Sequence, residues 1–110
     1  MKPLTLCASM RFTQEMQALA LTLEINHGFN VLQCTYNPKE IAISETEKQA
    51  IVDAHIKKID LSDAIYVVDI DGYIGQSVKE EIDYAKSQGK EIIFHSQFSN
   101  TDATNDKQED

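Results

Sequence analysis

Short apolar runs separated by polar segments recur along the chain and predict four β-strands. The runs are PLTLCAS, FNVLQC, AIYVVDI and EIIFH, at residues 3–9, 29–34, 64–70 and 91–95. The third run is almost continuously apolar and β-branched, which is typical of a central strand covered on both faces.

Three segments between these runs repeat apolar residues at spacings of three and four, as amphipathic helices do. The predicted helices span about residues 13–27, 44–60 and 77–88. Thr13 is expected to cap the first helix, while Ser44 and Ser77 each open a capping box with a glutamate three residues later. Gly28 and Gly89 are the expected helix stops.

The alternation of strands and helices predicts the fold class. Successive strand–helix units form a parallel sheet with right-handed crossovers and helices on both faces. We therefore expect an α/β fold, a flavodoxin-like or Rossmann-like three-layer sandwich with a parallel sheet of roughly four to five strands. At 110 residues the chain has the size of one domain, which is expected to span residues 1–98.

Charge and hydropathy narrow the range of partners. The net charge of −8 argues against a nucleic acid polymer, whose phosphates require basic surfaces. The apolar runs fall short of the ~20 residues of a membrane span and the N-terminus lacks a signal-peptide core, so we expect a cytoplasmic protein without a membrane partner. Residues 99–110 carry four acidic residues and one lysine, and they are expected to form a disordered tail.

The cysteines and histidines show no spacing typical of a metal site. Cys7 and Cys34 lie within apolar runs and are expected to be reduced, buried side chains. The three histidines lack metal-ligand spacing to cysteines or acids, and the chain has neither a Walker phosphate loop nor a full dinucleotide glycine fingerprint. We therefore expect no metal ion and no cofactor. His55, on the apolar side of the second helix, reads most simply as a core histidine.

The ends of the first and third strands are the expected ligand site. Ligands of open parallel sheets bind beyond the carboxyl ends of the strands, where the strand order reverses. The segments at that edge are SMRF, residues 9–12, and DIDGYIGQSVKEE, residues 69–81. The candidate ligand contacts within them are Ser9, Met10, Arg11, Asp69, Gly72, Gly75 and Ser77.

Glu81 is the candidate reactive group at this edge. The buried stripe of the third helix consists of Val78, Ile82 and Ala85. At about 100° per residue, Glu81 lies on the margin of this stripe, whereas Glu80 points toward water. That position aims a carboxylate from the first helical turn into the crevice. The structural alternative is an acid that stabilises the helix N-terminus by roughly a few tenths of a kcal/mol.

Arg11 is the one arginine of the chain, and its charge at the start of a helix opposes the helix dipole. An anionic ligand held by Arg11, Ser9 and backbone N–H groups would account for it. An ion pair with Asp69 or Asp71 across the crevice would account for it equally well. Ser77 is either a helix cap or, if its hydroxyl and N–H face the crevice, a phosphate ligand.

Three stretches carry a family resemblance: ASMRF, SDAIYVVDI and EEIDYAKSQGKEIIF. The last contains Glu81, Tyr84, Ala85, Gly89 and Lys90, arranged as Glu-x-x-Tyr-Ala-x-x-x-Gly-Lys after a glycine-rich loop. Together they resemble the nucleoside 2-deoxyribosyltransferase superfamily, which includes the 2′-deoxynucleoside 5′-monophosphate N-glycosidases. The resemblance spans residues 3–94.

The resemblance implies both an activity and roles for individual residues. The glutamate that opens this motif is the nucleophile of the superfamily, so Glu81 is expected to attack the anomeric carbon of a 2′-deoxyribosyl group. The resulting glycosyl ester would be resolved by water or a second base. Ser9, Arg11 and Ser77 are expected to hold the 5′-phosphate. Superfamily members form homodimers or larger homo-oligomers, and the expected partner is a small-molecule nucleoside or nucleotide.

The chain departs from the superfamily pattern at two positions. Thr5 stands where members carry a tyrosine in the first strand. His55 stands on or near the position of a helical aspartate that assists departure of the base. Histidine can donate a proton at neutral pH, so His55 could act as the acid, and Asp69 or Asp71 could substitute from the loop.

Two main hypotheses follow. The first is an enzyme that cleaves or transfers an N-glycosidic bond, with Glu81 as nucleophile and His55 or Asp71 as acid or positioning group. The second is a module that binds a nucleotide without turning it over, which the loss of the tyrosine and the aspartate favours. A flavodoxin-like interaction domain without a ligand is a third reading, and it leaves Arg11 and Glu81 without a role.

Overall fold

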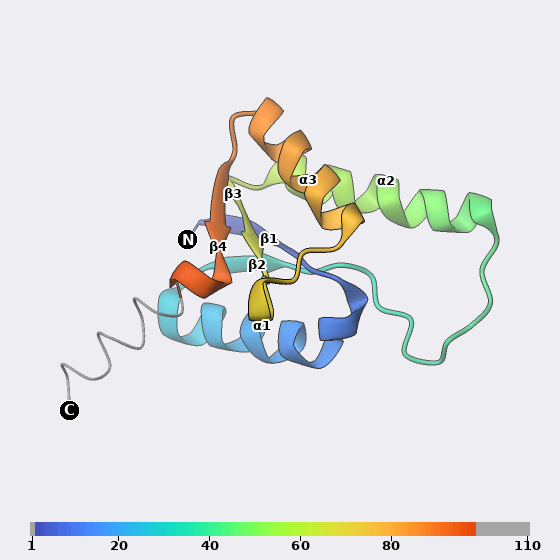
Figure 1. The fold of residues 1–110 in the computed structure, drawn as a ribbon, viewed down its shortest axis with the longest axis horizontal. Coiled ribbons are helices and arrows are strands. Elements are labelled where there is room, and N and C mark those ends of the chain that lie inside the picture. The colour runs from blue at the N-terminus through green and yellow to red at the C-terminus, as the bar shows by residue number, and fades with distance from the viewer. Residues whose placement is uncertain (1, 99–110) are drawn as a thin grey trace.

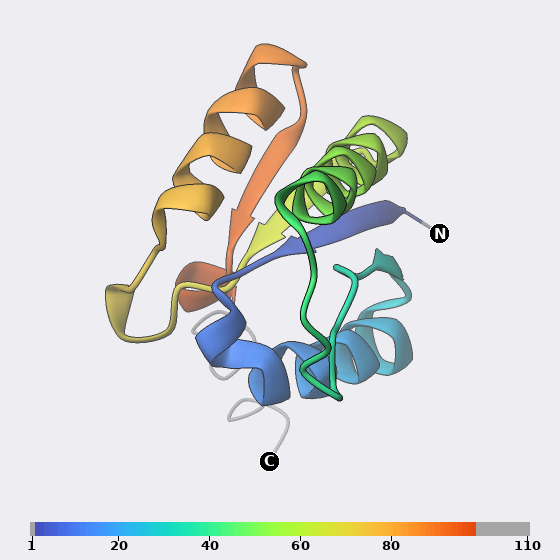
Figure 2. The same ribbon diagram turned by 90° about the vertical axis from the view of Figure 1, so that its right-hand side faces the viewer.

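The computed structural model describes residues 2–98 and confirms an α/β fold with an all-parallel sheet. The strands β1 (Pro3–Cys7), β2 (Asn30–Leu32), β3 (Ala64–Val67) and β4 (Glu91–Phe94) lie in the order β2-β1-β3-β4. One face of the sheet is covered by α1 (Thr13–His27), and the other by α2 (Glu45–Leu61) and α3 (Gln76–Ser87) (Figure 1 and Figure 2). This is the predicted three-layer flavodoxin-like or Rossmann-like sandwich. The predicted acidic tail lies outside the described residues.

Side chains of β1 divide between two apolar cores on opposite faces of the sheet. Leu4 and Leu6 pack with α1, whereas Cys7 belongs to the core beneath α2 and α3. Thr5 shares the Cys7 face, because residues two apart in a strand point the same way. All of β3 is buried, which confirms the prediction of a central strand. Within the described part of the chain, no helix is long and apolar enough to cross a membrane.

Of the two predicted capping boxes, one forms and the other does not. Ser44 and Glu47 form the reciprocal hydrogen bonds of a capping box at the start of α2. The second prediction was wrong, since α3 begins at Gln76 and its N-cap residue is Gly75, which makes no side-chain cap bond. Thr13 is likewise not a cap, because it is the first residue of α1 and its hydroxyl donates to the Met10 carbonyl at 2.6 Å.

The loops that follow β1 and β3 each contain a short 3-10 helix. The first, η1 (Met10–Phe12), separates β1 from α1, and the second, η2 (Ile70–Gly72), interrupts the connection from β3 to α3. Both predicted strands therefore end earlier than their apolar runs. Val68 stays buried beyond the end of β3, while Asp71 turns into the left-handed region at φ 56°.

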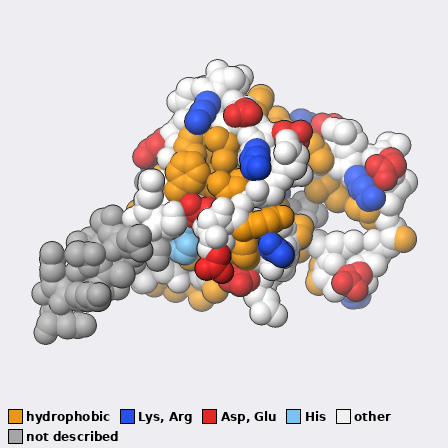
Figure 3. All heavy atoms as spheres, viewed as in Figure 1, with side chains coloured by type: hydrophobic (Ala, Val, Ile, Leu, Met, Phe, Trp, Pro, Cys, Tyr) orange, Lys and Arg blue, Asp and Glu red, His pale blue; other side chains and the backbone are white. Residues whose placement is uncertain are grey.

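β4 forms one edge of the sheet and carries an apolar surface. Among the described strands it pairs with β3 alone. Its last three residues, Ile92, Ile93 and Phe94, are partly exposed. Figure 3 shows apolar side chains gathered over this strand, with acidic and basic side chains around them.

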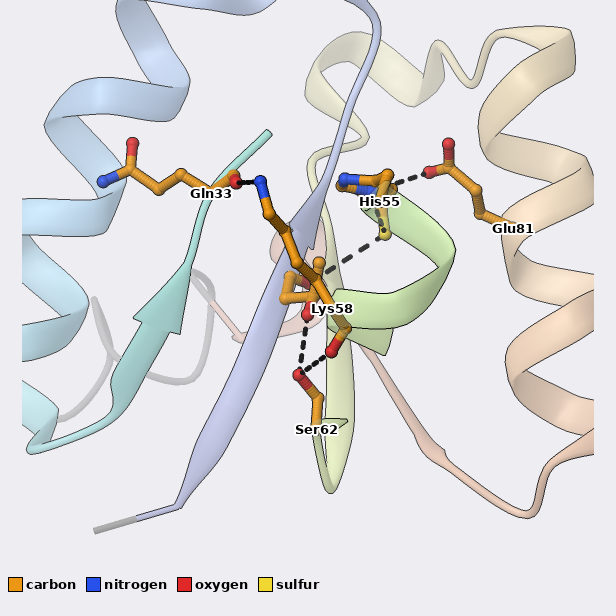
Figure 4. A network of polar contacts seen from close by, with 7 residues as sticks. Gln33, His55, Lys58, Ser62 and Glu81 are labelled. Carbon is orange, nitrogen blue, oxygen red and sulfur yellow. Dashed lines mark hydrogen bonds and ion pairs between the residues drawn. The ribbon is translucent and has the colours of Figure 1, made fainter. Parts of the chain in front are cut away.

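A pair of buried hydroxyls ties β1 to the end of α2. The Ser62 hydroxyl donates to the Lys58 carbonyl at 2.8 Å, so the Thr5 hydroxyl is the donor in its 2.6 Å contact with Ser62 (Figure 4). We predict that Ser62→Ala lowers the free energy of unfolding by about 1–3 kcal/mol, because the buried Thr5 hydroxyl loses its acceptor. Thr5→Val keeps the Ser62–Lys58 bond and the side-chain volume, so it should cost less than about 1 kcal/mol. Urea unfolding of both variants measures the difference, and an equal loss would contradict this direction of donation.

Candidate functional site

Two adjoining cavities lie at the carboxyl edge of the sheet, where β1 and β3 end. The first, here the Ser9 cavity, has a volume of about 390 Å³ and is lined by Ser9, Tyr73, Gly75 and Ser77 among others. The second, here the Glu81 cavity, has a volume of about 190 Å³ and is lined by Cys34, Thr35, His55, Ser77 and Glu81 among others. Ala8, Met10 and Ser77 line both cavities, so these two spaces adjoin, and we refer to them together as the groove.

Glu81 reaches its cavity from the second turn of α3. The helix begins at Gln76, one residue earlier than predicted, and no acidic residue lies in its first turn. The favourable effect of a helix dipole on a carboxylate falls off beyond the first turn. Helix stabilisation is therefore a weaker explanation for Glu81 than the sequence suggested. Its side chain is 21% exposed, which leaves the carboxylate open to a ligand in the cavity.

His55 faces Glu81 from α2, across the groove between the two helices (Figure 4). Its Nε2 lies 3.5 Å from Glu81 Oε1 and 3.6 Å from Cys7 Sγ. The other ring nitrogen, Nδ1, is buried and has no hydrogen-bond partner among the described residues. The sequence-based interpretation of His55 as a satisfied core histidine is therefore incomplete, because Nδ1 lacks a partner and Nε2 contacts the candidate nucleophile and a thiol.

Cys7 forms the floor of this cluster. Its side chain is fully buried, and burial together with the neighbouring Glu81 charge raises the pKa of the Cys7 thiol well above its usual value. Cys7 is thus a neutral thiol and a poor nucleophile in this state. Cys34 lines the Glu81 cavity and is half-buried, and burial also raises the pKa of its thiol. Both cysteines are free of disulfide bonds, as predicted.

The Ser9 cavity holds the predicted phosphate contacts, with one exception. Ser9 and Ser77 line it from η1 and from the first turn of α3. The Arg11 guanidinium carbon stands 4.2 Å above the ring of Tyr73, another lining residue. Arg11 forms no ion pair with Asp69 or Asp71, so that explanation for its position is wrong. A cation–π contact at the cavity rim holds it instead.

Asp69, Asp71 and Gly72 are not brought to the groove. Asp69 is 8% exposed, and its carboxylate accepts hydrogen bonds of 2.8 and 2.7 Å from the N–H and hydroxyl of Ser96. These bonds join the end of β3 to the segment after β4. Asp71 and Gly72 are exposed on η2 and line neither cavity. The predictions that placed these residues beside a ligand are therefore not supported by the geometry, and His55 is the acid–base group that faces Glu81.

The other positions of the Glu81 motif hold the end of α3 in place. Tyr84 donates to the Asp60 carboxylate, and the Lys90 ammonium donates to the Asp60 carbonyl. Ala85 lies in the core, and Gly89 takes a left-handed conformation at φ 72°. The motif thus combines one residue that lines a cavity, Glu81, with four residues that hold the C-terminal end of α3 in place.

Sequence reasoning missed the roles of Cys7 and Tyr73. Cys7 lies two residues after Thr5, so strand alternation alone would have placed it on the face that carries α2 and α3. Tyr73 is the aromatic residue of the glycine-containing loop before α3, adjacent to a predicted ligand segment. Neither signal specifies the partner that each side chain meets.

Comparisons with protein-family models, with curated proteins and with solved structures found no match to this chain.

The two thiols should differ sharply in reactivity. We predict that a disulfide reagent modifies Cys34 in the folded protein but reaches Cys7 only on unfolding, since Cys7 is fully buried and burial disfavours its thiolate. Thiol titration of Cys34→Ser should show no rapid phase, whereas Cys7→Ser should keep it. A rapid phase in Cys34→Ser would show that the Glu81 cavity opens down to Cys7.

Proposed function

We propose that this protein cleaves or transfers the N-glycosidic bond of a 2′-deoxyribonucleoside or its 5′-monophosphate, with Glu81 as the nucleophile. One observation carries the proposal: the Glu81 carboxylate faces a cavity at the carboxyl edge of the sheet, and its Oε1 lies 3.5 Å from His55 Nε2. A carboxylate and an acid–base group side by side in the lining of a small cavity are the parts that glycosidic bond cleavage requires.

The chemistry divides one difficult substitution into two easier ones. A Glu81 oxygen forms a bond to the anomeric carbon while the bond from that carbon to the base nitrogen breaks. The base leaves with a proton, which His55 can supply because its Nε2 faces the reacting edge of Glu81. Water or a second base then attacks the same carbon and releases the free carboxylate, and His55 can accept the proton that water loses.

The Ser9 cavity suits the 5′-phosphate of such a substrate. It adjoins the Glu81 cavity through Ser77, as a phosphate adjoins the sugar ring in a nucleotide. Backbone N–H groups in the first turn of α3 lack helical partners and favour an anion, and the hydroxyls of Ser9 and Ser77 add donors. Arg11 packs on Tyr73, which lines this cavity, so its guanidinium can supply a positive charge for the phosphate.

Binding without turnover is the second candidate function. It is favoured by Thr5, which replaces the tyrosine of the superfamily and is fully buried against Ser62 rather than exposed in the groove. The Glu81 cavity thus lacks an aromatic hydroxyl from β1, and catalysis would depend on His55 and Glu81.

Replacing Glu81 tests the nucleophile. We predict that Glu81→Gln reduces release of free base from 2′-deoxynucleoside 5′-monophosphates by at least about a thousandfold, because an amide cannot form the glycosyl ester. Asp83→Asn removes the same charge from an exposed position of α3 and should retain activity. Chromatography of the free base measures both. Release of base from Glu81→Gln at the wild-type rate would contradict the proposal. Stabilisation of the wild type by nucleotides in a thermal shift assay, without base release, would support the second candidate.

Replacing Arg11 tests the phosphate subsite. Arg11→Gln should raise KM for a 5′-monophosphate by about tenfold to a hundredfold, the usual loss of a charged hydrogen bond, and should leave the unphosphorylated nucleoside unchanged. Lys79→Gln removes a positive charge from the exposed face of α3 and serves as the control. An equal effect of Arg11→Gln on both substrates would exclude a phosphate contact.

A further inference from the structure

Cys7, His55 and Glu81 form a cluster of metal-ligand side chains that the sequence spacing could not reveal. They come from β1, α2 and α3, and their sulfur, nitrogen and oxygen atoms all lie within 4.8 Å of one another. The three atoms lie close together at the Glu81 cavity, which His55 and Glu81 line. Thiolate, imidazole and carboxylate are also the three protein ligands that zinc uses most.

Two of the three separations between these atoms match a tetrahedral zinc site. Zinc lies about 2.3 Å from a sulfur ligand and about 2.0–2.2 Å from nitrogen or oxygen. At tetrahedral angles, these lengths place two ligands roughly 3.3–3.6 Å apart. The structure has 3.5 Å between His55 Nε2 and Glu81 Oε1, and 3.6 Å between Cys7 Sγ and His55 Nε2. These two contacts already have the spacing of zinc ligands, and the third separation, from Cys7 Sγ to the Glu81 carboxylate, is within 4.8 Å.

We propose that Cys7, His55 and Glu81 bind a Zn²⁺ ion. The Cys7 thiol releases its proton to solvent and binds as thiolate, His55 binds through Nε2, and Glu81 binds through one carboxylate oxygen. The fourth position faces the Glu81 cavity and takes a water molecule. Three protein ligands with one open position distinguish this arrangement from a closed structural zinc site.

The surroundings of the cluster indicate a reversible site. A zinc-bound histidine usually donates its second N–H to an acceptor, and loss of that partner weakens metal affinity by about tenfold to a hundredfold. His55 Nδ1 has no such partner within residues 2–98. Binding also requires removal of the Cys7 proton, which lowers the apparent affinity further. The ion is therefore expected to exchange rather than to remain through folding.

Zinc binding would switch off the reaction proposed above. Coordination to zinc withdraws electron density from the Glu81 carboxylate and so makes it a weaker nucleophile, and His55 Nε2 can no longer carry a proton. This consequence rests on the proposed function, whereas the metal site itself does not. The cluster would thus make base release sensitive to the concentration of free zinc.

Metal titration tests the site directly. We expect the protein to compete with a chelating dye for zinc at one equivalent per chain, and bound Co²⁺ to give a sulfur-to-metal charge-transfer band. Cys7→Ser should abolish the band, while Cys34→Ser, which replaces the thiol that lines the Glu81 cavity, should keep it. Glu81→Gln and His55→Gln should each weaken zinc binding at least about tenfold, and Asp83→Asn should not.

The two proposals fail in different ways. No zinc binding by the wild type, or a cobalt band that survives Cys7→Ser, would overturn the metal site. Because Cys7 is fully buried and its replacement could disturb folding, Glu81→Gln provides the second test, and unchanged zinc affinity in that variant would also overturn the site. Absence of base release with intact zinc binding would contradict the glycosidic activity alone. Base release that persists at saturating zinc would exclude inhibition through Glu81.

Discussion

The parallel pairing of β1 with β3 is the interaction on which the groove depends. Cys7 pairs with Val67 at the last position of the register, and the Val68 N–H donates to the Cys7 carbonyl at 3.0 Å. The two strands therefore end together, and their loops leave the sheet at one edge. A slip of one residue would turn Cys7 toward α1 and separate it from His55, because successive side chains of a strand point to opposite faces.

The polar cluster at this edge is not explained by a contribution to folding. A half-buried carboxylate loses hydration, and a contact with one imidazole rarely returns more than it costs. Apolar side chains would fill the same space between α2 and α3 without that cost. The neutral state of the Cys7 thiol removes a second negative charge from the site, which leaves the Glu81 charge facing the cavity. Chemical reactivity thus explains these three residues better than stability does.

The start of α3 shows how a local signal can be overridden. Ser77 and Glu80 have the spacing of a capping box, as Ser44 and Glu47 do in α2, where the box forms. At α3, Gly75 takes the cap position, where a Cβ would lie 3.8 Å from Ser9 Cβ and 3.7 Å from the Tyr73 hydroxyl. These are ordinary van der Waals distances, and the helix begins at Gln76, one residue before the predicted start. Ser77 is consequently left in the first turn, on the wall between both cavities.

The sequence by itself determined the layers of the fold, the central position of β3 and the placement of Glu81 beside the carboxyl edge. These follow from hydrophobic periodicity and from the rule that parallel strands align their ends, and both are properties of local sequence and topology. Only the tertiary structure decided which polar groups meet Glu81. Asp69 accepts hydrogen bonds from Ser96, and Arg11 packs on Tyr73. Cys7 and His55 lie beside the Glu81 carboxylate. Side-chain partners depend on the relative positions of elements far apart in the chain, and no spacing along the sequence encodes those distances.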